Sequence, residues 1–147
     1  MQPFRLDSPR ADHAGRAVVS ACFGEDLEAE PGDLVYGISV DGTVVSHLDL
    51  YWKTIHVGEQ LVDVAAIGQV GTLPDHRGRG FASALVEAAH EDSKRHVPYA
   101  GLFGSLAFYG RFGYRETNLT DELGFLLCPL SGEHPAIGEV DLDGQRW

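Results

Sequence analysis

The chain has 147 residues, of which 44% are hydrophobic and 22% are charged, and its net charge is −11. This composition predicts one globular domain over residues 1–147 that buries a core without disulfide staples. The acidic balance argues against nucleic acid or an anionic membrane as a partner, because both require a basic surface. No apolar run approaches the ~20 residues of a membrane span and residues 1–5 lack a signal-peptide pattern, so a cytoplasmic protein is expected.

The order of the expected elements is typical of an α/β or α+β domain. Ser8 and Pro9 suit the N-cap and the first position of a helix. Asp41-Gly42, between two β-branched runs, is a strong hairpin signal. The expected elements, in chain order, are a helix over 9–23, strands over 34–40, 43–56 and 62–73, a helix over 82–95, a strand over 99–103, a short helix over 105–112, and strands over 114–117 and 124–130. Residues 131–147 are expected to be mostly loop.

A turn rich in glycine and arginine, residues 77–82, links the third strand to the second helix. This order places several backbone N–H groups at a helix N-terminus, where the helix dipole favours an anion such as pyrophosphate. Gly78 and Gly80 permit close approach of the backbone and unusual φ/ψ values, while Arg77 and Arg79 can supply charge. No Gly-Lys-Ser/Thr follows, which excludes a Walker A loop, and the preceding antiparallel strands argue against a dinucleotide-binding βαβ unit.

The spacing Arg77-x-x-Gly80-x-Ala82 resembles the Q/R-x-x-G-x-G/A motif of the GCN5-related N-acetyltransferase (GNAT) superfamily, which binds the pyrophosphate of acetyl-CoA. The segment Ser105–Tyr114, Ser-Leu-Ala-Phe-Tyr-Gly-Arg-Phe-Gly-Tyr, is similar to the second, aromatic motif of that superfamily. The resemblance implies a GNAT fold, with a mixed central sheet of about six to seven strands that is flanked by helices and splayed at the fourth strand. It also implies acetyl-CoA as the cofactor and an N-acetyltransferase activity on a primary amine.

Tyr109 matches the tyrosine that often protonates the departing CoA thiolate in this superfamily. A phenol with a pKa of ~10 suits that role, and a packed core tyrosine is the alternative. The resemblance implies direct attack of the neutral amine, accelerated by proximity. It also implies that a backbone N–H near residues 70–72, on the strand that corresponds to the fourth strand of the GNAT fold, polarises the thioester oxygen. The expected cofactor-binding residues are Val70, Gly71, Thr72, Arg77, Gly78, Arg79, Gly80, Phe81, Ala82 and Ser105.

Three patches carry a narrower resemblance. Tyr109–Tyr114, and the pattern from Val64–Ile67 through His76–Gly78, resemble the enhanced-intracellular-survival (Eis) aminoglycoside acetyltransferases. The ending Gly138–Trp147 resembles the tails of small GNAT enzymes, including aminoglycoside 2'-N-acetyltransferases. These resemblances, with acids gathered after the first helix, between the last two strands and in the tail, imply a small, polycationic amine as substrate. A solvated acidic surface is the alternative. The substrate candidates are Glu25, Asp26, Asp33, Gln69, Asp121 and Trp147.

The general base is unassigned. His47 and Asp49 share one face of the strand over 43–56, so either could face the cleft; a structurally hydrogen-bonded His47 is the alternative. Asp63 lies on the same strand face as Gln69 by alternation, but further from the glycine turn.

His76 is expected to be an exposed loop residue. Cys22 and Cys128 are expected to be free, buried thiols, because their spacing fits neither a redox pair nor a metal site. No metal site is expected, since the histidines form no convincing cluster with the cysteines or acids.

Two other functions stay open beside a small-molecule acetyltransferase. One is acylation of a protein N-terminus or lysine, for which a shallow acceptor groove would be typical. The other is a non-catalytic acyl-CoA-binding module that keeps the cofactor site alone. A homodimer also stays open.

Overall fold

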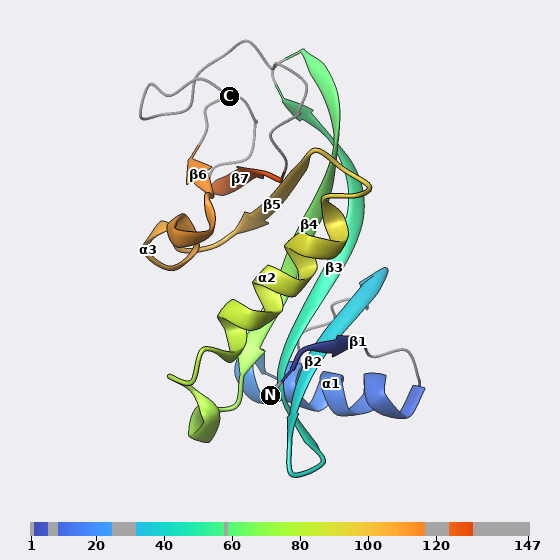
Figure 1. Cartoon of the computed structure of the whole chain (residues 1–147), viewed down its shortest axis with the longest axis vertical. Helices are drawn as coiled ribbons and strands as arrows, with labels where there is room; N and C mark the ends of the chain where they lie inside the picture. Colours follow the sequence, from blue (N-terminus) through green and yellow to red (C-terminus); the bar gives the residue numbers. More distant parts are fainter. Residues whose placement is uncertain (1, 6–8, 25–31, 58, 117–123, 131–147) are drawn as a thin grey trace. The chain divides into compact units, whose positions relative to one another are not determined.

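A computed structural model of the chain describes residues 2–5, 9–24, 32–57, 59–116 and 124–130 (Figure 1). Its elements are β1 (Phe4–Arg5), α1 (Pro9–Phe23), β2 (Leu34–Val40), β3 (Thr43–Val57), β4 (Gln60–Thr72), the 3₁₀ turn η1 (Pro74–His76), α2 (Phe81–Ser93), β5 (Tyr99–Phe103), α3 (Leu106–Tyr109), the 3₁₀ turn η2 (Gly110–Phe112), β6 (Arg115–Glu116) and β7 (Phe125–Pro129). The predicted helices and strands are confirmed within about two residues at each described end. The sequence did not predict β1 or η1.

The described strands form one seven-stranded mixed sheet in the order β1-β2-β3-β4-β5-β7-β6, flanked by helices, as the GNAT resemblance implies. The pairs β1–β2, β2–β3, β5–β7 and β6–β7 are antiparallel. The predicted hairpin joins β2 to β3: Asp41 and Gly42 have φ values of 50° and 79°. Positive φ at both central residues is what a type I′ turn requires.

The residues divide into two compact units, one made of residues 1–51 and 67–89 and the other of residues 52–66 and 90–147. The division falls within β3, β4 and α2, so each of these elements contributes residues to both units. The single domain expected over residues 1–147 stays a prediction.

In the first unit, α1 packs on the sheet through one stripe of small and β-branched side chains. Ala14, Val18 and Cys22 are spaced four residues apart and therefore share a helix face. Val18 is buried against Val35 of β2 and Val44 of β3.

In the second unit, the core lies over β4, β5 and β7. Val62 and Val64 pack with Tyr99, Phe125 and Leu127, all buried. Residues 99–102 and 125–128 are buried without alternation, which matches their short, continuous apolar runs. Among the described residues, no helix is both long and apolar enough to cross a bilayer.

Gly32 lies so close to its neighbours that a side chain has no room. A Cβ added there would lie 2.7 Å from the carbonyl oxygen of Leu50, 2.8 Å from the amide nitrogen of Leu50 and 2.9 Å from the carbonyl oxygen of Leu34. Because these are backbone atoms, we expect Gly32→Ala to lower the free energy of unfolding by about 2–3 kcal/mol in urea titrations. The control is Gly42→Ala, which has positive φ but open space and should lose only about 1 kcal/mol. Equal losses would contradict the steric argument.

Candidate functional site

The glycine-rich turn belongs to the first unit and adopts the backbone conformation that its glycines allow. Gly78 and Gly80 have φ values of 77° and 79°, which confirms the predicted unusual conformations. No described atom lies within 4 Å of a Cβ added at either position. Conformation, and not lack of space, therefore requires glycine here, and the backbone of the turn is open to a ligand.

The N-terminus of α2 follows this turn directly. The first bond of the helix runs from the Ala84 N–H to the Gly80 carbonyl over 3.0 Å. The N–H groups of Phe81, Ala82 and Ser83 precede the helical hydrogen-bond ladder, so they are placed to bind an anion. The Phe81 side chain is 9% exposed, so its contribution to a ligand site would come from its backbone.

Side chains hold the end of β4 at the start of the turn. Arg77 Nε donates to the Thr72 carbonyl over 2.9 Å, and both Arg77 and Arg79 are exposed. Ser46 Oγ donates to the Gly71 carbonyl over 3.1 Å. Because that bond uses the single proton of Ser46, the Thr72 hydroxyl is the donor in the 2.8 Å contact between the two hydroxyls.

Gln69 interrupts the regular backbone of β4. Among the described residues, it is one of two non-glycine residues with positive φ, at 47°. An L-residue in this region breaks the strict alternation of side chains along the strand. The prediction that Asp63 shares a strand face with Gln69 assumed strict alternation and stays a prediction; Asp63 itself is exposed and accepts a 2.7 Å hydrogen bond from Thr54 Oγ1.

His47 is fully buried and hydrogen-bonded, which is the structural alternative that the sequence left open. Its Nδ1 lies 3.1 Å from the Gln69 carbonyl oxygen and its Nε2 lies 3.1 Å from Arg16 Nη2. A carbonyl only accepts and a guanidinium only donates, so the proton of the neutral ring must be on Nδ1. With both ring nitrogens engaged, His47 is not a free base.

Asp49 is also fully buried, and its carboxylate is paired. Arg16 Nη2 lies 2.8 Å from each carboxylate oxygen, and the Gly32 N–H donates to Oδ1 over 3.0 Å. Burial, followed by the charge and hydrogen bond of Asp49, raises the pKa of Tyr51 to about 12. We refer to the half-buried Arg16 together with the fully buried His47 and Asp49 as the buried cluster.

Tyr109 lies in α3 of the second unit. Ser105 occupies the N-cap position, where its carbonyl accepts from the Phe108 and Tyr109 N–H groups at 3.1 and 2.9 Å. The Tyr109 ring makes edge contacts with Phe108 and Tyr114, with centroids 4.8 and 5.8 Å away. Burial raises the pKa of Tyr109, so the phenol keeps the proton that a general acid must donate.

The sequence reasoning missed His90, which lies behind the aromatic motif. Its Nε2 is 2.6 Å from the Tyr114 hydroxyl, and its ring makes an edge contact with Phe112. Burial lowers the pKa of His90 to about 4 and raises that of Tyr114 well above its usual value. The sequence indicated these contacts only weakly. His90 lies in a helix that precedes the aromatic motif, but helical spacing alone does not show which aromatic rings pack on the histidine.

The substrate candidates are only partly described. Glu25, Asp26, Asp121 and Trp147 lie outside the described residues. Asp33 is exposed, and Gln69 is half-buried with its Oε1 buried and lacking a hydrogen-bond partner in the described part of the chain.

His76 and the cysteines differ in part from expectation. His76 is half-buried in η1, where its Nδ1 has no hydrogen-bond partner among the described residues, so the exposed position was wrong. Cys22 and Cys128 are free, as predicted, but only Cys128 is buried; Cys22 is half-buried, with its Sγ 3.4 Å from the Thr72 carbonyl. The described residues hold no group of three or more possible metal ligands.

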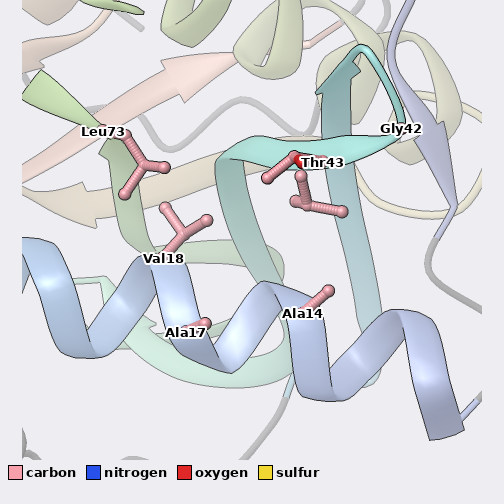
Figure 2. Close-up of a pocket in the computed structure, with 7 residues that line it drawn as sticks. Ala14, Ala17, Val18, Gly42, Thr43 and Leu73 are labelled. Atoms are coloured by element: carbon pink, nitrogen blue, oxygen red, sulfur yellow. The ribbon is translucent and has the colours of Figure 1, made fainter. Parts of the chain in front are cut away.

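A pocket of about 280 Å³ lies between α1 and the β2–β3 turn in the first unit (Figure 2). Figure 2 shows side chains of α1 on one side and those of Thr43 and Leu73 on the other. The lining residues are Ala14, Ala17, Val18, Gly42, Thr43, Val44 and Leu73. None of them is a predicted site residue, and no charged group lines the pocket, so it offers nothing to hold a phosphate.

Comparisons with known proteins identify the family. The family model for the acetyltransferase (GNAT) domain matches residues 15–117, which is more than half of the chain. The chain therefore belongs to the GNAT acetyltransferase family, and the resemblance drawn from the two motifs is confirmed. No curated protein sequence matches significantly.

Solved structures with a similar fold include Eis1 from Mycobacterium abscessus, at 26% identity and a TM-score of 0.70 over 80% of this chain and 32% of Eis1. The E. coli GNAT protein YhbS in complex with CoA is 17% identical, with a TM-score of 0.71 over 88% of this chain and 81% of YhbS. A Brucella melitensis GNAT acetyltransferase in complex with acetyl-CoA is 18% identical, with a TM-score of 0.66 over 91% of this chain and 92% of that protein. The chain thus spans about a third of the length of Eis1 but nearly all of the Brucella protein.

The lowered pKa of His90 predicts an acid-dependent loss of stability. Because the folded-state value of about 4 lies below the ordinary 6.5, the unfolded chain takes up the proton first as the pH falls. The stability from neutral His90 is complete above pH 6.5 and is lost between pH 6.5 and 4. From pH 7 to 5 we expect this group to account for a loss of roughly 2 kcal/mol in urea titrations. His90→Gln should lose correspondingly less, and an imidazole NMR titration near pH 6.5 would contradict the prediction.

Proposed function

We propose that the chain is an acetyl-CoA-dependent N-acetyltransferase that acts on a primary amine of a small molecule. The observation that carries the proposal is the turn at the start of α2, where Gly78 and Gly80 adopt positive φ beside free space. CoA or acetyl-CoA is bound in structures of two GNAT proteins of the same fold.

The described residues fit the diphosphate of CoA. The N–H groups at the start of α2 and the exposed Arg79 supply donors and positive charge. Arg77 is exposed as well, but its Nε already donates a hydrogen bond to the Thr72 carbonyl, so Arg77 would act mainly by stabilising the conformation of the turn. The backbone of Val70, Gly71 and Thr72 is assigned to the acetyl thioester.

Acetyl-CoA would supply an activated acetyl group. The protein would hold the amine and the thioester together, which accounts for much of the acceleration in a direct transfer. A backbone N–H of β4 would donate to the thioester oxygen, and the Tyr109 hydroxyl would donate its proton to the departing thiolate. A phenol is protonated at neutral pH, as the donor must be, and the burial that raises the pKa of Tyr109 keeps it so.

Polycationic amines, such as aminoglycosides and polyamines, are the first acceptors to test. The net charge of −11 favours their approach, and Asp33 places one exposed acid in the first unit. A protein amine as acceptor and a non-catalytic acyl-CoA-binding module are the alternative outcomes of the tests below. A cytoplasmic location and a homodimer stay predictions.

Replacement of Tyr109 by Phe tests the catalytic part of the proposal. We expect kcat to fall by about 100-fold, because a general acid contributes on the order of 10²–10⁴ in rate. The Kd for CoA should change little, since only the hydroxyl is removed. Release of CoA thiol is measured against aminoglycosides, polyamines, amino acids and peptides, and CoA binding by calorimetry.

Phe108→Leu is the matched control for aromatic packing beside Tyr109, and it should retain most of kcat. If wild-type protein binds CoA but no amine in the panel releases thiol above background, the non-catalytic module is favoured. Turnover with peptides alone would favour the protein acetyltransferase.

Replacement of Gly80 by Glu tests the cofactor site. The new carboxylate would repel the diphosphate and the side chain would occupy the free space, so CoA affinity should fall by 100-fold or more. Gly42→Glu is the control: it introduces the same side chain at a similar positive φ, in the β2–β3 turn. CoA binding by Gly80→Glu equal to that of the control would place the diphosphate elsewhere.

A further inference from the structure

The backbone at Gln69 is held in a conformation that its own side chain does not favour. Its φ of 47° is in the left-handed region, where the Cβ of an L-residue lies too close to the carbonyl oxygen and the backbone is strained. Glycines occupy comparable positions in the turn, at Gly78 and Gly80. A non-glycine residue keeps such a conformation only where its surroundings enforce it, and such residues gather at functional sites.

A buried hydrogen bond holds this conformation. His47, 0% exposed, donates from Nδ1 to the Gln69 carbonyl over 3.1 Å. The donor is fixed because Arg16 Nη2 donates to the other ring nitrogen. The other tautomer would set two acceptors against each other at Nδ1 and two donors at Nε2, and a ring flip would put C–H groups in place of both nitrogens, so this orientation and tautomer satisfy both partners.

Asp49 holds Arg16 in place. The carboxylate accepts from Arg16 at 2.8 Å through both oxygens and from the Gly32 N–H at 3.0 Å. The contacts therefore run from α1 through β3 to β4, all within the first unit.

The carbonyls that follow Gln69 at the end of β4 are hydrogen-bonded as well. Ser46 binds the Gly71 carbonyl, and Arg77 and Cys22 bind the Thr72 carbonyl. The carbonyls of Gln69, Gly71 and Thr72 thus all have protein partners. Because a peptide unit is planar, the direction of the Gln69 carbonyl fixes that of the Val70 N–H, and the direction of the Gly71 carbonyl fixes that of the Thr72 N–H.

We propose that His47, set by Arg16 and Asp49, is a positioning residue that orients the peptide N–H of Val70 toward the thioester carbonyl of acetyl-CoA. The proposal rests on the proposed function, because it assumes that acetyl-CoA binds beside this segment. It assigns to the buried cluster a role in transition-state stabilisation without contact with substrate.

The test compares two amide replacements of His47. In His47→Asn the amide nitrogen takes the place of Nδ1 and can still donate to the Gln69 carbonyl. In His47→Gln the amide lies near the Nε2 position, and the donor at Nδ1 is lost. We measure the carbonyl stretching frequency of bound [1-¹³C]acetyl-CoA by isotope-edited infrared spectroscopy, the Kd for CoA by calorimetry, and kcat with the most active amine.

We expect the carbonyl frequency to be lowered in wild type and His47→Asn and to move back toward the free value in His47→Gln. The rate constant kcat should fall at least 10-fold in His47→Gln, with Kd for CoA within about threefold of wild type, because one oxyanion donor contributes on the order of 10²–10³. Adding Gln69→Gly to His47→Gln should recover part of both signals, since glycine adopts the positive φ without strain.

The outcomes distinguish a failure of the proposed function from a failure of this proposal. No CoA binding by wild type would overturn the proposed function and this proposal together. CoA binding with the same carbonyl frequency in wild type and His47→Gln would overturn this proposal alone. If His47→Gln fails to fold, its double variant with Gln69→Gly is compared with His47→Asn plus Gln69→Gly, and equal frequencies there also overturn it.

Discussion

The ion pair between the half-buried Arg16 and the fully buried Asp49 is the constraint on which the first unit depends. A carboxylate without solvent contact is tolerated only when it is paired and hydrogen-bonded, and removal of one partner leaves a buried charge without compensation. Asp49 meets this requirement with partners from two distant parts of the chain, Arg16 of α1 and Gly32 ahead of β2. Satisfying one charge therefore fixes where α1 lies on the sheet and how the chain begins β2.

The same ion pair is connected to β4 through His47, which contacts Arg16 and the Gln69 carbonyl. The strand β4 and the following turn use two physical means of keeping a left-handed backbone. At Gly78 and Gly80 the residue type removes the strain, while at Gln69 a buried donor enforces the conformation. The first means leaves the turn open to a ligand, and the second leaves a side chain at position 69 for another use. In this member of the GNAT family, the buried cluster thus lies beside β4 and is hydrogen-bonded to its irregular backbone at Gln69.

Sequence patterns predicted the parts that local physics decides. The Asp41-Gly42 turn was readable because few residues accept positive φ, and the burial of Tyr99 to Leu102 followed from a short apolar run between polar segments. The turn at residues 77–82 was readable for the same reason. β1 was missed because its two residues, Phe4 and Arg5, are in a strand only through their pairing with β2.

The sequence by itself determined the order of helices and strands, the glycine turn at the start of α2 and the family. Each depends on residue types at short spacing, which govern backbone freedom, helix starts and hairpins. Tertiary structure alone decided what His47, Asp49 and His90 do. A histidine or aspartate on a strand face reads the same whether it is a base in a cleft or a partner in a buried network. That difference is set by desolvation and by hydrogen-bond partners far away in the chain, Arg16 for His47 and Tyr114 for His90.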